Sequence, residues 1–251
     1  MILCLLLALA QSHSNSPGFP AYKRANELFV NKRMNEALAA LEQALTKDER
    51  LVPALTLYAK IAMASNRYDL ARNSLERALE ADPKSADALF LYGFQFYLQN
   101  NLQDALPAFE KARQLNPKDS RATYYLGLTY ESLGRLEEAL PLYMAAGDAA
   151  AYVSGTRLLN SMGRLDEAAK WIQKALQLEP GSRDAHFEAA RLLLRGEAFS
   201  KSAKEAERAL ALAGGSITDA QIHFLLIRAY RDTDPGKSAE HAAALRAITD
   251  R

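Results

Sequence analysis

The sequence is poor in residues that break helices, and it contains only one cysteine and one tryptophan. Glycine (12 of 251 residues) and proline (9) are scarce and runs of β-branched residues are missing, so we expect an all-α chain. The 31 basic and 30 acidic residues leave a net charge of +1, which indicates no bulk attraction to nucleic acid or to an anionic membrane. Hydrophobic residues make up 49% of the chain, which is ample for a core.

Motifs of catalysis are also missing. There is no P-loop, no nucleotide-binding glycine pattern, no G-x-S-x-G and no H-E-x-x-H. The four histidines are His13, His186, His223 and His241, and no two of them stand three or four residues apart, as two metal ligands on one helix face would. We therefore expect no enzyme, no metal site and no cofactor, and we expect His186 and His223 to be buried and hydrogen-bonded.

The first ten residues differ from the rest. Met1–Ala10 (MILCLLLALA) is an uninterrupted apolar run that is far too short to span a bilayer. Its last three residues, Ala-Leu-Ala, fit the A-x-A cleavage site of a secretory signal peptide, which would be cut between Ala10 and Gln11. We predict a signal peptide over residues 1–10, a leader over 11–17, export to the periplasm or out of the cell, and no transmembrane segment.

Two residues bear on this prediction. No Lys or Arg precedes Lys23, so the positive n-region of a signal peptide is absent, and a chain that keeps its first residues would stay in the cytoplasm. Cys4 would leave with the signal. The mature chain would then contain no cysteine, a composition that tolerates an oxidising compartment.

Beyond the leader the sequence repeats. Residues 85–120 contain two successive helical patterns, in which apolar or small residues share one helix face. The first pattern is Leu89, Tyr92, Gly93 and Phe96, and the second is Ala105, Phe109 and Ala112. A polar turn separates the patterns, and Pro117 ends the second, since proline disfavours helix at the residue before it. One such pair of helices cannot bury both faces, so copies of the pair must stack.

Small residues return at fixed positions in the copies. One column of the second helices is Ala37, Ala71, Ala105, Ala139, Ala168 and Ser202, and another is Ala44, Ala78, Ala112, Ala146, Ala175, Ala209 and Ala243. The step between copies is 34 residues, except for 29 between the fourth and fifth copies, from Ala139 to Ala168 and from Ala146 to Ala175. Small side chains let two helix backbones approach closely, while larger residues fill the gap between them.

This pattern resembles the tetratricopeptide repeat (TPR) family in its period, its small-residue columns and the prolines that end three copies. The tryptophan typical of the family's first helix is absent, because Leu55 and Leu89 stand there, and Trp171 lies in a second helix. The resemblance implies a right-handed α-solenoid superhelix of seven helix-turn-helix repeats. The repeats are 18–51, 52–85, 86–119, 120–148, 149–182, 183–216 and 217–251.

The fourth repeat is five residues short. Gly147 suits the end of its second helix, and Asp148 suits the N-cap of the next helix. The segment that follows has weak helix propensity, because Val153, Gly155 and Thr156 occur together. We therefore expect the softest joint of the array over residues 151–159.

In TPR proteins the first helices line a concave groove, and the resemblance implies two groups of groove residues here. The aromatic group, in repeats three and four, is Phe90, Phe94, Tyr97 and Tyr124, with Leu128 beside it. The basic group, in repeats five to seven, is Arg157, Arg191, Arg195 and Arg228, with Asn160 and Phe187. Aromatic residues supply large contact area and arginine pairs bidentately with carboxylates. We therefore expect a peptide with aromatic or aliphatic anchors followed by acidic groups.

An alternative remains open for each group. Phe90 and Phe94 could belong to the core, because a first helix is sandwiched between its neighbours. The arginines could pair with acidic residues on a solvated surface, namely Asp184, Glu188 or Glu131. The Lys/Asn carboxylate clamp of TPR proteins that bind chaperone tails is not reproduced at the matching positions, Tyr22, Asn26, Thr56 and Lys60.

The predicted function is that of a non-enzymatic, exported scaffold or assembly adaptor that binds a protein or peptide, and not nucleic acid, in its groove. One alternative is a structural protein that self-associates into a homo-oligomer. Another is the regulatory arm of an enzyme complex.

Overall fold

The computed structural model describes residues 15–250, and over this range the chain forms α-helices and no strand. The expectation of an all-α chain is thereby confirmed. The predicted signal peptide and its cleavage position between Ala10 and Gln11 lie outside the described residues. None of the described helices combines the length and the apolar character that crossing a membrane requires.

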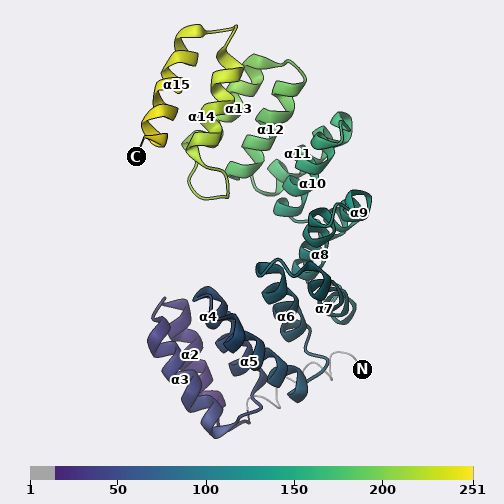
Figure 1. Ribbon diagram of the computed structural model, residues 1–251, viewed down its shortest axis with the longest axis vertical. Coiled ribbons are helices and arrows are strands. Elements are labelled where there is room, and N and C mark those ends of the chain that lie inside the picture. Colours follow the sequence, from purple (N-terminus) through teal and green to yellow (C-terminus); the bar gives the residue numbers. More distant parts are fainter. Residues whose placement is uncertain (1–14, 251) are drawn as a thin grey trace. The chain divides into compact units, whose positions relative to one another are not determined.

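Successive helices follow one another along the described chain, joined by short turns (Figure 1). They are α2 (Phe19–Val30), α3 (Met34–Lys47), α4 (Val52–Ala64), α5 (Tyr68–Ala81), α6 (Ala86–Leu98), α7 (Leu102–Leu115), α8 (Ser120–Ser132), α9 (Leu136–Ala146), α10 (Ala149–Ser161), α11 (Leu165–Leu178), α12 (Arg183–Arg195), α13 (Phe199–Ala211), α14 (Asp219–Tyr230) and α15 (Pro235–Thr249). Each predicted repeat contains two of these helices.

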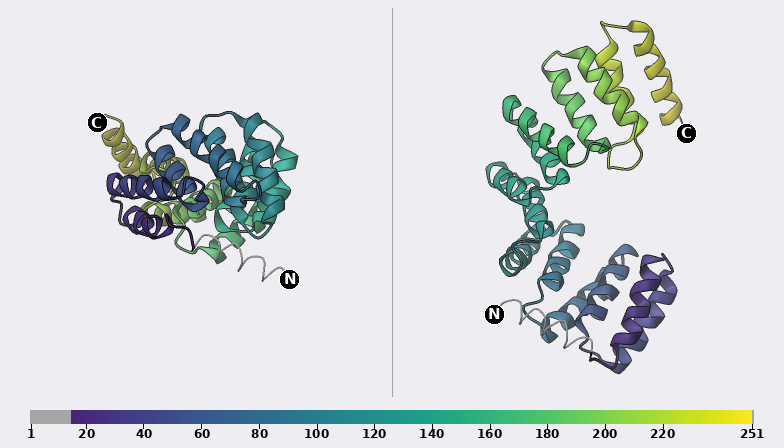
Figure 2. Two further views of the ribbon diagram at one scale, coloured as in Figure 1. Left: turned by 90° about the horizontal axis from the view of Figure 1, so that it is seen from below. Right: turned by 180° about the vertical axis from the view of Figure 1, so that it is seen from behind.

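The chain divides into two compact units. Unit 1 extends to Gly134 and contains α2–α8, and unit 2 begins at Arg135 and contains α9–α15. In unit 1, α4 packs against α5 and also contacts α2 and α6. In unit 2, α12 packs against α13 and also contacts α10 and α14, and Figure 2 shows these hairpins from two further sides. Within each unit, the first helices of successive hairpins therefore lie against one another.

The small-residue columns lie at these helix contacts. Ala71, Ala105 and Ala168 are fully buried. Gly93 on α6 faces Phe109 on α7, and a Cβ at this glycine would lie 2.9 Å from Cδ1 of the Phe109 ring. The large side chain of one helix therefore fills the space that the small residue of its partner leaves open.

A residue with left-handed backbone conformation recurs in the turns inside the hairpins. Asn66 and Asn100 have φ of 57°, and the equivalent residue Glu197 has φ of 58°. Glycine and asparagine adopt this conformation readily, whereas a residue such as glutamate does so at a cost. The turn geometry therefore repeats even where the residue type does not suit it.

The shortened fourth repeat ends as the sequence predicts. Gly147 follows α9 with φ of 70°, and the Asp148 carboxylate accepts a hydrogen bond of 2.9 Å from the Ala151 amide at the start of α10. The next segment forms a regular helix in spite of its weak propensity. A Cβ at Gly155 would lie 2.0 Å from Cζ3 of Trp171, so this glycine is where the indole ring packs against α10. Glycine therefore occurs at this position of α10 because any side chain would collide with the Trp171 ring of α11.

The last helix, α15, has no buried residue. This is the exposure expected of a helix that is packed only on its hairpin partner, and it fits the expectation of a polar last helix.

Candidate functional site

The predicted aromatic residues of unit 1 cluster around one tyrosine. The Phe90 and Phe94 rings stack with centroids 5.9 Å apart, and the Tyr125 ring meets Phe94 edge-on at 4.9 Å. Tyr97 and Tyr124 also contact the Tyr125 ring, with centroids 5.4 and 5.5 Å away. Such pairs add stability beyond the area they bury.

Burial separates the members of this cluster. Phe90 has only 6% of its surface exposed and packs against Phe109, which favours the alternative that Phe90 belongs to the core. Phe94, Tyr97 and Leu128 are half-buried, as is Tyr124. Most of the predicted aromatic surface is therefore turned toward other side chains of unit 1.

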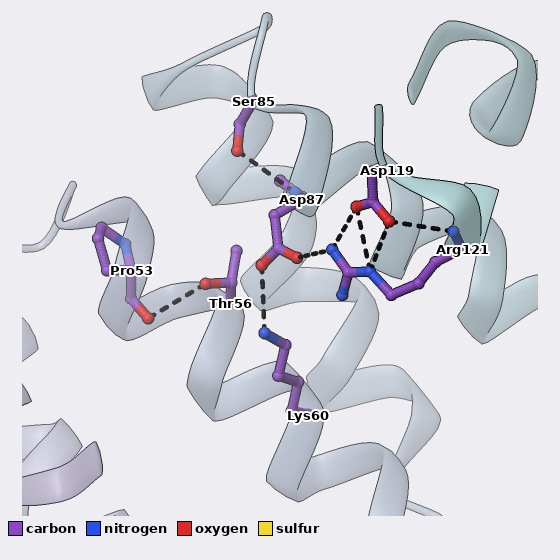
Figure 3. A network of polar contacts seen from close by, with 8 residues as sticks. Pro53, Thr56, Lys60, Ser85, Asp87, Asp119 and Arg121 are labelled. Carbon is purple, nitrogen blue, oxygen red and sulfur yellow. Dashed lines mark hydrogen bonds and ion pairs between the residues drawn. The ribbon is translucent and has the colours of Figure 1, made fainter. Parts of the chain in front are cut away.

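A chain of charges crosses the first helices of the same unit (Figure 3). The Asp87 carboxylate on α6 accepts from Lys60 Nζ on α4 at 3.2 Å and from Arg121 Nη2 on α8 at 3.1 Å. Arg121 also donates to Asp119 at 2.6 Å, and its guanidinium lies 4.6 Å from the Phe90 ring centroid. The Arg121 guanidinium lowers the pKa of the Asp119 carboxyl. Each of these side chains thus already has a partner within unit 1.

A pocket of about 240 Å³ lies beside this chain of charges, on α2, α4, α6 and the turn before α6. It is lined by Tyr22, Asn26, Val52, Pro53, Thr56, Leu57, Lys60, Asp82, Ser85 and Asp87. One lysine and two aspartates contribute the charges, so the lining is close to neutral and slightly acidic.

Unit 2 contains a larger pocket, of about 420 Å³, on α10, α12 and α14. It is lined by Asn160, Ser161, Phe187, Arg191, Leu194, Arg195, Gln221, Phe224, Leu225 and Arg228. Three of these residues are arginines and none is acidic. We call it the basic pocket.

The three arginines of the basic pocket differ in what they already bind. Arg191 Nη1 donates to both carboxylate oxygens of Glu188, at 2.9 and 3.1 Å. Arg195 donates to the main-chain oxygen and to Oδ1 of Asn160. Arg228 forms no hydrogen bond or ion pair with any other residue in the described range. Its guanidinium is therefore available to a ligand.

Apolar side chains complete the basic pocket. Phe187 and Leu225 are buried and form part of its wall, whereas Phe224 has 56% of its surface exposed. Phe224 and Arg228 stand four residues apart on α14, so they lie on the same helix face. A free guanidinium and an exposed aromatic ring are thus presented together.

Two sequence models described as Tetratricopeptide repeat match the chain, one over residues 28–93 and the other over 95–153 and 157–217. The chain belongs to the tetratricopeptide repeat family. No curated protein matches it.

Solved structures show the same fold. The structure from the functional characterization of Pseudomonas aeruginosa pilF is 18% identical, covers 94% of this chain and 93% of that chain, and has a TM-score of 0.60. MamA is 28% identical, with 62% of this chain and 94% of that chain covered and a TM-score of 0.55. YrrB, described as a TPR protein with an unusual peptide-binding site, is 22% identical, with 76% and 98% covered and a TM-score of 0.56. The expected solenoid of TPR repeats is thereby confirmed.

In this TPR protein, the predicted basic residues divide between the pocket and its surroundings. Asn160, Phe187, Arg191, Arg195 and Arg228 all line the basic pocket, as a shared groove would require. Arg157, one turn earlier on α10, is exposed and outside the lining.

The sequence left open that the arginines pair with acidic residues of the protein itself, and one of the three pocket arginines does so. Glu188 binds Arg191, as that alternative allows. Asp184 binds the loop before α14 instead, accepting from the amide and hydroxyl of Ser216 at 2.9 Å.

Five further residues line the pocket. Leu194, Gln221 and Leu225 stand 34 residues from Arg228, Phe187 and Arg191, in the same groove-facing columns of the first helices. Ser161 and Phe224 were not predicted. The spacing of Phe224 to Arg228 is a signal that could have identified the aromatic residue, but in the sequence Phe224 is hidden in the apolar run from Phe224 to Ile227.

Three histidines lie in the described residues, and each has a ring nitrogen within hydrogen-bonding distance of another polar atom. His186 is buried, with Nδ1 2.7 Å from Glu205 Oε2 and Nε2 3.0 Å from the Pro180 carbonyl oxygen. His223 is half-buried, and its Nδ1 lies 3.1 Å from Nδ1 of His241, whose pKa is lowered by burial and by His223. Within residues 15–250, no three His, Cys, Asp or Glu side chains come together as a metal centre would need.

Proposed function

We propose that this TPR protein is a non-enzymatic scaffold that binds a segment of a partner protein in the basic pocket, and that this segment places an acidic group beside an aromatic or aliphatic side chain. The observation that carries the proposal is the composition of the lining, which contains three arginines and no acidic residue. Arginine and aromatic side chains are the types that contribute most at binding hot spots, and guanidinium groups pair bidentately with carboxylates.

The shape of the site supports a short segment rather than a small metabolite. The pocket draws its lining from three successive first helices, and a stack of rigid helices presents such residues at fixed spacing. The structure of YrrB is described as having a peptide-binding site, so a fold of this kind can serve as a peptide receptor.

Short labelled peptides test the proposal on the full chain. One peptide carries two glutamates next to a phenylalanine, and its partner carries glutamines in their place. We expect fluorescence anisotropy to show tighter binding of the acidic peptide, and we expect Arg228→Ala to weaken it about tenfold, the loss of one good charge-assisted contact.

Arg246→Ala is the matched control, because it removes an arginine of α15 that does not line the pocket. It should leave the affinity unchanged. Equal binding of the two peptides, or an Arg228→Ala variant that binds as well as the parent chain, would overturn the assignment of the pocket.

The proposal includes an assembly-adaptor role after export from the cytoplasm. Its support is the apolar Met1–Ala10 run with the Ala-Leu-Ala end. Mass spectrometry of the N-terminus, on protein from the native cells, tests it directly. A mature chain that begins at Gln11 supports export, and a cytoplasmic chain with its first ten residues intact refutes it.

A further inference from the structure

Glu188 is a buried carboxylate that binds one arginine of the basic pocket. It lies on α12, three residues before Arg191, and has 3% of its surface exposed. It is not part of the pocket lining, whereas Arg191 is. Both of its oxygens nevertheless lie within 3.1 Å of Arg191 Nη1. One arginine of the pocket is therefore already bound by an anion of the protein itself.

The surroundings of Glu188 favour its neutral form. Burial raises the pKa of the Glu188 carboxyl, and the Asp184 carboxylate on the same helix adds to the increase. Arg191 and, from α10, Arg157 act in the opposite direction, but burial has the larger effect. From α14, the nearest first helix on the other side, the charge facing the pocket is Arg228.

An anion that enters the pocket would share Arg191 with Glu188. The two negative charges would then lie close together on one guanidinium, and like charges repel. Removing the charge of Glu188 would leave Arg191 free to join Arg228 in holding the ligand.

We propose that Glu188 competes with the ligand for Arg191, an inference that rests on the proposed function of the pocket. The ionised carboxylate of Glu188 weakens binding of an anion, and protonation of this carboxylate strengthens it. The pocket thereby couples binding of an acidic segment to uptake of a proton. The direction follows from linkage: a bound anion favours the protonated carboxyl, so the protonated carboxyl favours the bound anion. Affinity should rise as the pH falls through the raised pKa of Glu188.

The probe for this test must keep its own charge. We choose a short peptide with a sulfotyrosine, because its sulfate group stays ionised from about pH 4.5 to 7.5, where carboxylates and histidines titrate. Binding to the full chain is measured by calorimetry across this range, for the parent chain and for Glu188→Gln. The control is Glu167→Gln on α11, which removes an exposed charge of unit 2 that is paired with Arg164.

We expect Glu188→Gln to bind the probe about tenfold more tightly at neutral pH, the effect of removing one nearby charge, and to show little change with pH. The parent chain and Glu167→Gln should approach that affinity only as the pH falls. Thermal melts at each pH show that the variants are folded. Glu188→Gln should also lose the fall in stability that the parent chain shows as the pH rises above the ordinary range of a glutamate, because ionising a buried carboxyl costs free energy.

Two negative results have different meanings. If the probe binds through Arg228 but Glu188→Gln changes neither its affinity nor its pH dependence, Glu188 is not a competitor and the pocket assignment stands. If the probe does not bind, or binds equally to Arg228→Ala, both the pocket and the competitor role are refuted.

Discussion

The pockets of the two units lie on corresponding helices but differ in charge. In unit 1, Lys60 and Arg121 are bound by Asp87, and the aromatic rings of α6 and α8 pack on one another. In unit 2, the basic pocket has three arginines, and Arg228 has no partner within the described chain. Equivalent helices of the two units therefore differ in whether their charged side chains are already paired within the protein.

We expect substitution of the buried aromatic residues of unit 1 to lower the stability of the protein. We expect substitution of the exposed aromatic residue of the basic pocket to weaken binding instead. Phe109 is fully buried beneath Phe90 and Tyr125, so Phe109→Ala should lower the free energy of unfolding by about 3–5 kcal/mol, the cost of a large buried cavity. Chemical denaturation measures this loss. Phe224→Ala is the matched change in unit 2, and it should weaken peptide binding while leaving stability nearly unchanged. A reversal of these effects would break the comparison.

Unit 1 should also gain stability from the loss of one buried amide. Gln95 on α6 is fully buried, and neither of its amide atoms has a hydrogen-bond partner in the described part of the chain. The equivalent residue of the preceding repeat is Ile61. We expect Gln95→Leu to raise the free energy of unfolding by about 1–2 kcal/mol, because the unpaired polar atoms disappear. A decrease on thermal and chemical denaturation would show that the amide is satisfied in solution.

A turn of unit 2 offers a smaller gain. Glu197 has φ of 58°, where Asn66 and Asn100 stand in the equivalent turns of unit 1. We expect Glu197→Gly to stabilise the chain by about 1 kcal/mol, because glycine has no side chain to strain in this conformation. The control, Gly196→Ala, concerns a residue with negative φ of −84° and should not reproduce the gain. A melting temperature unchanged by Glu197→Gly would mean that this turn carries no strain.

The smallest effect should come from the ion pairs of Figure 3. Arg121 and Asp87 are 48% and 40% exposed in their side chains, and pairs at this exposure contribute little to stability. Arg121→Ala should therefore cost less than about 1 kcal/mol. Its clearer effect should be on ligand preference, since it leaves Asp87 with Lys60 alone. If Arg121→Ala gives unit 1 no affinity for a cationic peptide, the ion pair of Asp87 with Arg121 is not what prevents ligand binding there.

Much of the fold could be predicted from the sequence. The columns at Ala71, Ala105 and Ala168 identify the hairpins because only small side chains fit where two helices meet. Gly147 and Asp148 mark the shortened repeat because each has a defined backbone role there. Residues 151–159, predicted as the softest joint, belong to a regular helix, and low propensity gave no sign that its glycine accommodates Trp171. The division into units falls earlier, after Gly134.

The candidate site was predicted only in part, because spacing along the chain does not show which side chains are buried. Arg191, Arg195 and Arg228 stand on corresponding helices, so spacing alone brings them to one face. The burial of Phe90 could not be predicted, because an aromatic residue on a sandwiched helix has the same spacing whether it faces solvent or Phe109. Phe224 was missed because it lies within an apolar run, from which exposure cannot be inferred.

The sequence by itself determined the helices, their pairing and the number of repeats, because these depend on local periodicity and on the size of side chains at fixed intervals. Only the tertiary structure decided which charges are already bound and which remain available. Asp87 reaches Arg121 across 34 residues, whereas Arg228 has no acidic residue in reach among those described. Whether a charged side chain binds its own protein or a ligand depends on distances between helices, and no interval along the chain encodes them.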